Sequence, residues 1–282
     1  MQTQARIEQI TGVPVTALRP LHGGSIGQVY RADLRDGRAV AVKVAGGDGT
    51  LDLEGEMLRY LSQRSSLPVP DVLHAEPGLL IMSFIPGGSD LNSDVQRHAA
   101  DLLAELHSIP APHFGFERAT LIGGLRQPNP WTDSWVAFFR DHRLLYMAGE
   151  ARRAGRLPAN LHRRIESFAA RVGELITEPD QPALIHGDMW TTNILAQDGR
   201  VTGFVDPAVY YAHPEIELAF STLFGTFGDA FFDRYNELRP IAPGFFEQRR
   251  DIYNLYPLLV HVRLFGAGYV GSVERILREA GF

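Results

Sequence analysis

The chain has 282 residues, of which 45% are hydrophobic and 21% charged, a globular composition with room for one large domain or two lobes. Its net charge of −6 argues against a protein that binds nucleic acid or an anionic membrane, and the absence of cysteine excludes disulfide scaffolds and thiolate chemistry. No apolar run approaches the roughly 18 residues of a membrane span. A signal peptide would need an apolar stretch where Arg6 and Glu8 stand, so we expect a soluble, cytoplasmic protein.

The start of the chain is predicted to be rich in β-strand. Two apolar runs, 29–34 and 38–44, flank an Asp-Gly pair, which is a strong hairpin signal. The segment HGGSIGQVY leads into the first run and contains Gly23, Gly24 and Gly27. A glycine-rich turn between strands can bring backbone N–H groups close to phosphates, although the spacing here is not that of G-x-G-x-x-G. We therefore expect these glycines near the phosphates of a nucleotide.

A helix and a short strand complete this first part of the chain. Leucine spacing predicts a helix over 50–64, which two prolines end. The run LLIMSFI, residues 79–85, has the pattern of a buried strand and is closed by a Pro-Gly-Gly break. We therefore predict an N-terminal lobe over residues 1–85.

From residue 86 the pattern becomes mainly helical. Residues 108–130 are rich in proline, glycine and asparagine and are predicted to form an irregular surface excursion. The predicted helices are 93–107, with Ser93 as the cap, 132–147 and 160–176, and the predicted short strands are 183–186, 193–195 and 201–205. The fold class is therefore α+β and bilobal, with a small antiparallel lobe and a larger helical lobe over 86–282. A cleft is expected between the lobes.

The strongest chemical signal is the run HGDMWTTN, residues 186–193, followed thirteen residues after Asn193 by Asp206. A carboxylate at Asp188 can orient and deprotonate a substrate hydroxyl. The amide oxygen of Asn193 and the carboxylate of Asp206 are ligands of the kind that Mg²⁺ prefers. Protein kinases use this arrangement for phosphoryl transfer. Because Asp and Asn are also ordinary turn formers, the pair alone decides little.

The lysine content supports the same interpretation. The 27 basic residues comprise 26 arginines and a single lysine, Lys43, which lies in the alternating strand over 39–44. This position matches the strand lysine of protein kinases, where a compact ammonium is needed rather than a planar guanidinium. The order of glycine-rich turn, strand lysine, helix glutamate, hinge, Asp–Asn loop and second aspartate indicates a kinase-like protein.

Two glutamates of the helix over 50–64 are candidates to pair with Lys43. At 100° per residue Glu54 falls inside the apolar stripe and Glu56 on nearly the opposite face. In relatives of this fold the pairing glutamate stands eleven residues before the leucine of an L-P-V-P turn, which here is Leu67. On that spacing we predict Glu56, with Glu54 as the alternative.

The run HGDMWTTNIL followed by FVDPAVYYAHPEIELAF resembles the signature of the fructosamine (ketosamine-3-) kinases. The segment QPNPWTDSW, residues 127–135, and the tail over 255–266 are similar to the same family. The resemblance spans essentially the whole chain and is weakest in the first 20 residues. It implies ATP-dependent phosphorylation of the sugar 3-hydroxyl in ketosamines, the adducts of sugars with lysine side chains or other amines. The product breaks down and frees the amine, which amounts to deglycation.

The resemblance also implies roles for single residues. Asp188 would be the catalytic base, and Asn193 and Asp206 would hold Mg²⁺. Lys43, positioned by Glu56, would bind the α- and β-phosphates of ATP.

Further residues are expected around the adenine and the sugar. Met82 would lie at the back of the adenine pocket, and the backbone of the next three residues would read the adenine edge: Ser83, Phe84 and Ile85. Trp190 and either Tyr210 or Tyr211 are candidates to line the sugar pocket, with core packing as the alternative.

The chain departs from the family in a few places. Glu217 stands where the family has an aspartate before Leu-Ala, and we expect it to anchor the catalytic loop from a helix. Asp206-Pro207-Ala208 replaces the Asp-Phe-Gly of protein kinases, so we expect no phosphorylation-controlled loop and therefore constitutive activity. The protein is assumed to be a monomer. Two rivals stay open: a kinase of another hydroxyl metabolite, such as an aminoglycoside or choline, and a catalytically silent nucleotide-binding protein. Trp190 and the DPAVYY run favour the ketosamine.

Overall fold

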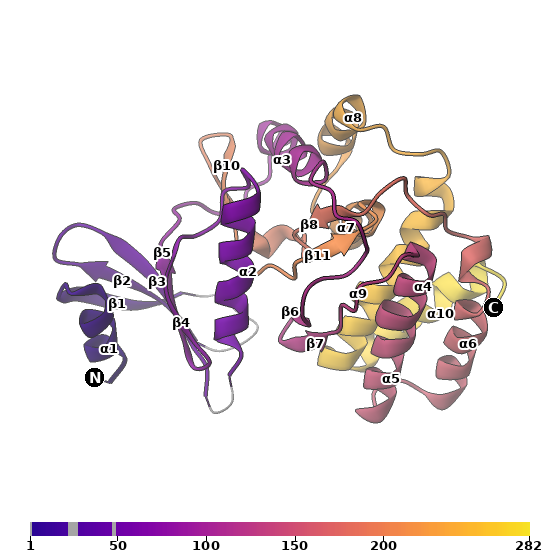
Figure 1. The fold of residues 1–282 in the computed structure, drawn as a ribbon, viewed down its shortest axis with the longest axis horizontal. Helices are drawn as coiled ribbons and strands as arrows, with labels where there is room; N and C mark the ends of the chain where they lie inside the picture. The colour runs from indigo at the N-terminus through magenta and orange to yellow at the C-terminus, as the bar shows by residue number, and fades with distance from the viewer. Residues whose placement is uncertain (1, 22–27, 47–48) are drawn as a thin grey trace.

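The computed structural model describes residues 2–21, 28–46 and 49–282, and it has two lobes (Figure 1). The N-lobe is a five-stranded antiparallel sheet in the order β1-β2-β3-β5-β4 with two helices. Its elements are α1 (Gln2–Thr11), β1 (Val15–Leu21), β2 (Gln28–Leu34), β3 (Ala39–Val44), α2 (Leu51–Arg64), β4 (Val72–Glu76) and β5 (Leu79–Ser83). The predicted glycines Gly23, Gly24 and Gly27 lie outside the described residues.

The C-lobe is mainly helical and contains three two-stranded ladders, β6–β7, β8–β11 and β9–β10. Its helices are α3 (Ser93–Leu106), α4 (Trp135–Phe139), α5 (Tyr146–Arg153), α6 (Ala159–Ala169), α7 (Glu215–Leu223), α8 (Asp229–Leu238), α9 (Arg250–Phe265) and α10 (Val270–Glu279). Short π- or 3₁₀-helical stretches are η1 (Arg140–Leu145), η2 (Val172–Glu174), η3 (Thr191–Asn193), η4 (Phe245–Arg249) and η5 (Ala267–Tyr269). The strands are β6 (Thr120–Ile122), β7 (Leu125–Gln127), β8 (Ala183–Ile185), β9 (Ile194–Gln197), β10 (Arg200–Phe204) and β11 (Tyr210–Ala212).

The alternation of side chains along β3 decides which face of the sheet receives the lysine. Val40 and Val42 point to the face covered by α1, where they pack with Ile7. Ala41 points to the opposite face and packs with the leucines of α2. Because strand side chains alternate, Lys43 lies on the α2 face as well. That face looks toward the C-lobe, since α2 stands between the sheet and the C-lobe (Figure 1).

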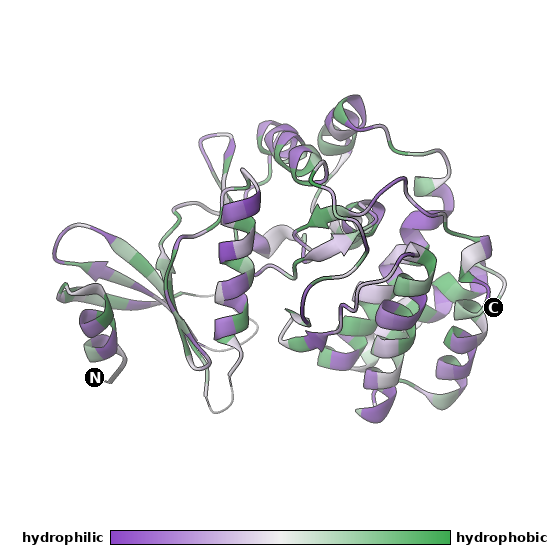
Figure 2. Cartoon of the chain, viewed as in Figure 1, coloured by the Kyte–Doolittle hydropathy of each residue, from purple (hydrophilic) through white to green (hydrophobic). Residues whose placement is uncertain are grey.

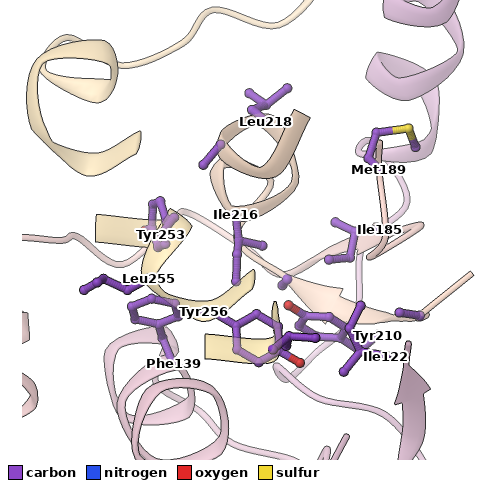
Figure 3. Packing of buried hydrophobic residues seen from close by; sticks show 14 of the residues in the cluster. Ile122, Phe139, Ile185, Met189, Tyr210, Ile216, Leu218, Tyr253, Leu255 and Tyr256 are labelled. Carbon is purple, nitrogen blue, oxygen red and sulfur yellow. The ribbon is translucent and has the colours of Figure 1, made fainter. Parts of the chain in front are cut away.

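The C-lobe is built around α9, in which every residue from Ile252 to Val262 is buried. The aromatic side chains of α4 pack against it, and Figure 3 shows part of this core, with Tyr253, Leu255 and Tyr256 of α9 among the labelled residues. The helices of both lobes carry hydrophilic and hydrophobic faces (Figure 2), as expected for helices that cover a core from one side. Within the described ranges no helix is both long and apolar enough to cross a membrane.

The observed fold confirms the predicted α+β, bilobal class and corrects two local expectations. The cap of α3 is Asn92, whose side chain accepts from the N–H groups of Asp94 and Val95, and not Ser93. The segment 108–130 is only partly an irregular surface excursion: it has exposed residues such as Pro112 and Glu117, but it also forms the β6–β7 hairpin and buries its phenylalanine and amide side chains. Its proline and glycine content predicts an absence of helix but carries no information on burial. The lobe boundary at residue 85 stays a prediction.

Candidate active site

Lys43 connects the two lobes. Its side chain is only 8% exposed, and Nζ lies 2.6 Å from Oε1 of Glu54 on α2 and in contact with the carboxylate of Asp206 from the C-lobe. Burial alone would disfavour the charged form. The carboxylates of Asp206 and Glu54 outweigh that cost and raise the pKa of Lys43. The single lysine of the chain is therefore a fixed positive charge in the cleft.

The prediction that Glu56 pairs with Lys43 is wrong. The structure pairs the lysine with Glu54, the alternative, whose side chain is 14% exposed. Two residues further along α2, the side chain of Glu56 points away from the sheet, is 47% exposed and accepts from Arg118 at 2.5 Å. A helix turns by about 200° over two residues, so only one of the two glutamates can face β3. The apolar stripe of α2 therefore indicated the correct residue, and the spacing to Leu67 did not.

This correction gives a prediction with a built-in control. Glu54→Gln should lower kcat/KM for ATP by about 10²-fold, because Lys43 loses the charge that holds it in place. Glu56→Gln removes an exposed ion pair and should leave kcat/KM within about twofold, since such pairs contribute little. Steady-state kinetics at varied ATP measures both. Equal losses in the two variants would contradict the assignment of Glu54.

Asp188 lies on the loop between β8 and η3 and is held by Asn193. The Asn193 amide Nδ2 donates to the backbone oxygen and to Oδ2 of Asp188, both at 2.9 Å. Burial, together with the nearby carboxylate of Asp206, raises the pKa of Asp188 to about 8, although donation from Asn193 opposes the rise. When it is ionised, a carboxylate in this environment is a stronger proton acceptor than a solvated one.

Glu217 anchors this loop from α7, as the sequence predicts. Its Oε1 accepts from the backbone N–H of Gly187 at 2.6 Å, and its Oε2 accepts from Nε2 of His107 at 2.8 Å. Nδ1 of His107 in turn meets the hydroxyl of Tyr235 at 2.7 Å. Burial opposes the charge of Glu217, but the hydrogen bonds and charge of His107 and the N–H of Gly187 keep its pKa below the ordinary value. The extra methylene relative to aspartate is thus accommodated.

The loop that carries Asp206 lies directly against the Asp188 loop. Asp206 has a left-handed backbone, with φ of 56°. The N–H of Ala208 donates to the backbone oxygen of His186 at 2.7 Å. Gly187, with φ of 89°, approaches so closely that a Cβ there would lie 2.1 Å from the Ala208 carbonyl oxygen. Only glycine fits at that position.

These loops and the N-lobe enclose one pocket, in which Lys43, Asp188, Asn193 and Asp206 all face the same space. The rest of its lining is Thr50, Leu51, Glu54, Met57, Leu121, Gly123, Gly124, Trp190, Thr192 and Pro207. Since Nδ2 of Asn193 is used by Asp188, its Oδ1 is the atom left to join the Asp206 carboxylate on a cation. Two oxygen donors beside open space fit Mg²⁺, which usually takes only one or two protein ligands and completes its shell with phosphate and water.

A second pocket opens on the other side of Asp188 and Trp190. Its remaining lining is apolar and aromatic: Ile122, Gly123, Phe220, Pro257, Val260, His261, Leu264 and Phe265. Trp190 also packs against Phe224, with ring centroids 5.9 Å apart. Sequence analysis did not predict the residues of α9 here. The similarity of the 255–266 tail to the family was the only signal that could have found them.

Tyr210 and Tyr211 do not reach either pocket. Tyr210 is 1% exposed and lies in the C-lobe core (Figure 3), where its ring faces the guanidinium of Arg143 at 3.9 Å. Tyr211 is 3% exposed, and its hydroxyl meets that of Tyr60 at 3.0 Å. The expectation that one of them lines the sugar pocket is wrong, and core packing, the alternative, is what both side chains do.

The residues expected around adenine lie at the end of β5. Met82 is buried on the α2 face of the sheet with Ala41 and Leu80. The N–H of Ser83 donates to the Asp71 carbonyl at 2.9 Å, and that of Phe84 donates to the Ala39 carbonyl at 3.2 Å. Both N–H groups are thus used within the N-lobe. If the strand end reads adenine, the donor is Ile85, and this role stays a prediction.

The site is thus a strand lysine paired with a helix glutamate, set over a loop with an Asp and an Asn and beside a second aspartate. With the two-lobed fold, this arrangement defines a phosphotransferase of the protein-kinase-like class. At 16% identity, an aminoglycoside phosphotransferase solved with ADP and hygromycin B shares this fold with a TM-score of 0.73, each chain covered over its full length.

More similar proteins define the family. The fructosamine kinase family model matches residues 1–280. A "probable ketoamine kinase" of Synechocystis is 34% identical over 97% of this chain and 94% of its own. A chloroplastic protein-ribulosamine 3-kinase of Oryza sativa is 32% identical over 98% and 81%. A crystal structure of a "putative fructosamine-3-kinase" of Thermobifida fusca matches with a TM-score of 0.84 at 30% identity, covering 98% of each chain.

The chain belongs to the fructosamine kinase family. It is therefore a phosphotransferase with an alcohol group as acceptor.

Proposed function

We propose that the protein transfers the γ-phosphoryl group of Mg-ATP to the sugar 3-hydroxyl of a ketosamine. The observation that carries the proposal is the position of Asp188, which lines both the charged pocket with Lys43 and the aromatic pocket with Trp190. A base at the junction of two pockets can take a proton from an acceptor in one while the acceptor oxygen faces a phosphate in the other.

Each charged side chain then has one task. Asp188 accepts the proton of the acceptor hydroxyl, whose oxygen forms a bond to the γ-phosphorus as the bond to the β-phosphate oxygen breaks. Lys43, held by Glu54, binds the α- and β-phosphates. Asn193 and Asp206 would hold Mg²⁺, which when bound neutralises charge on the phosphate oxygens.

The aromatic pocket supports an acceptor without phosphate groups of its own. Among the described residues its lining contains neither lysine nor arginine, and burial lowers the pKa of its one histidine, His261, which favours the neutral imidazole over a cation for an anionic ligand. Its aromatic and aliphatic side chains suit a sugar ring and the alkyl chain of the attached amine. Ribulosamine and fructosamine adducts of lysine have both parts. The 3-phosphate of such an adduct is unstable, so its breakdown frees the amine and completes deglycation.

Removal of the metal should abolish activity. With EDTA in excess, turnover should fall at least about 10²-fold and return on addition of Mg²⁺, because the charge stabilisation by a catalytic metal is worth several kcal/mol. An ADP-release assay measures the change. Full activity in EDTA would contradict the role of Asn193 and Asp206 as metal ligands.

The acceptor is tested directly by Mg-ATP consumption against fructose-lysine, ribulose-lysine, an aminoglycoside and choline, with ³¹P NMR to locate the new ester. A 3-phosphate on a ketosamine supports the proposal and ranks the two sugars. Turnover of the aminoglycoside or choline alone would contradict the acceptor and keep the phosphotransferase.

A further inference from the structure

The segment Gln127-Pro128-Asn129, singled out above only by its resemblance to the family, is buried in the C-lobe. Gln127 ends β7, is 0% exposed and uses every polar atom of its side chain. Its Nε2 donates to Oγ1 of Thr120 at 2.9 Å and to the carbonyl of Ala208 at 3.2 Å, and its Oε1 accepts from the hydroxyl of Tyr256 at 2.6 Å. One amide thus joins the β6–β7 hairpin, the loop after β10, and α9.

The contact with Ala208 concerns the active site, because this residue follows Asp206 by two positions. The peptide of Ala208 is fixed by the catalytic loop, through its hydrogen bond to His186 and the close approach of Gly187. Nε2 of Gln127 donates to the Ala208 carbonyl oxygen, the atom that Gly187 also approaches. Asp206 has a left-handed backbone, which aspartate adopts more readily than most residues. The two contacts at Ala208 fix the course of the chain just beyond it.

Asn129 also holds the β6–β7 hairpin, through hydrogen bonds of its side-chain amide. Its Nδ2 donates to Oγ1 of Thr120 at 2.8 Å, and its Oδ1 accepts from Nη2 of Arg143 at 2.6 Å. Arg143 is 0% exposed, and its guanidinium faces the rings of Phe138 and Tyr210. The amides of Gln127 and Asn129 are fully hydrogen-bonded, whereas Nε of Arg143 has no partner among the described residues. These bonds attach the hairpin to the core of the C-lobe.

The tip of this hairpin reaches the reaction site. Gly123, between β6 and β7, lines both the charged pocket and the aromatic pocket, and Gly124 lines the charged one. The base of the hairpin, at Gln127, is bonded to the loop of Asp206. Gln127 therefore links the hairpin that lines both pockets to the loop that carries Asp206.

We propose that Gln127 is a positioning residue that holds Asp206 in its metal-binding orientation through the carbonyl of Ala208. The inference rests on the proposed function in one respect, the role of Asp206 as a metal ligand. Tyr256 acts on the same amide from α9, since its hydroxyl fixes Oε1 and so directs Nε2 toward the loop.

Binding of Mn²⁺ in the presence of ADP, followed by electron paramagnetic resonance, tests this without any acceptor. Gln127→Leu should weaken Mn²⁺ about tenfold or more, which is the usual effect of losing a residue that supports a metal ligand. Tyr256→Phe should weaken it about threefold, because the amide remains but loses one anchor. Tyr253→Phe is the matched control on the same helix, since among the described residues its hydroxyl accepts from Nε1 of Trp135, at 3.0 Å, and bonds to neither loop.

Wild-type Mn²⁺ affinity in folded Gln127→Leu would overturn the proposal, and so would an equal loss in the Tyr253 and Tyr256 variants. If Gln127→Leu does not fold by circular dichroism, the two tyrosine variants decide. Both lose one buried hydrogen bond, so a purely structural role would lower their melting temperatures alike and leave Mn²⁺ affinity unchanged in each. Because no ketosamine is used, failure of the proposed acceptor would not affect this result.

Discussion

Asp188→Asn is expected to lower kcat by about 10²- to 10⁴-fold, the range of a lost general base. The substitution keeps the size of the side chain but removes the oxygen that can accept the acceptor's proton. Nucleotide affinity should stay near that of the wild type, because Lys43 and Asp206 are unchanged. Single-turnover phosphoryl transfer and calorimetric titration with Mg-ADP measure the two quantities separately.

The same change elsewhere provides the control. Asp198 lies at the β9–β10 turn, ten residues away in the sequence, with an exposed side chain and a left-handed backbone that asparagine adopts readily. Asp198→Asn should turn over at the wild-type rate. An Asp188→Asn enzyme that keeps most of its turnover would remove Asp188 from the role of base.

Lys43→Arg should lower kcat by about 10²- to 10³-fold, similar to the loss of one preorganised charge donor in an active site. Nζ fits in a buried space between the carboxylates of Glu54 and Asp206. A guanidinium is planar and wider, and its forked donors would bind the two carboxylates in place of the phosphates. Kinetics at saturating Mg-ATP measure the loss.

Lys43→Met separates charge from shape at this position. It removes the ammonium and keeps an unbranched chain of similar length, so it should be at least as inactive as Lys43→Arg. Near-normal turnover in the arginine variant would mean that any cation suffices there, and that the single lysine has no special role.

Sequence patterns predicted the features that depend on local chemistry. The alternation along β3 and the hairpin before it placed Lys43 on a strand, and the spacing of Asp188 and Asn193 placed them on one loop. The structure brings these three side chains and Asp206 to one pocket. Such features follow from side-chain periodicity and turn chemistry, which depend only on residues close together in the sequence.

Features that depend on contacts between distant segments were not predicted. The choice between Glu54 and Glu56 was made on the spacing to Leu67 against the apolar stripe of α2, and the sequence shows no sign that Arg118 pairs with Glu56 on the outer face of that helix. Tyr210 or Tyr211 was expected in the sugar pocket on the resemblance to the family, but the ring of Tyr210 lies in the core against the buried guanidinium of Arg143. No role was predicted for Gln127, since its partner Ala208 is 81 residues away in the sequence.

The burial of Lys43 also affects how the protein itself reacts with reducing sugars. Schiff bases and the rearranged adducts that follow them form on accessible primary amines, and guanidinium groups do not give them. Here the sole side-chain amine of the chain is almost wholly buried, charged and held between two carboxylates. The other basic side chains of the chain are 26 arginines, so its positive charge is carried almost entirely by groups that do not form these adducts.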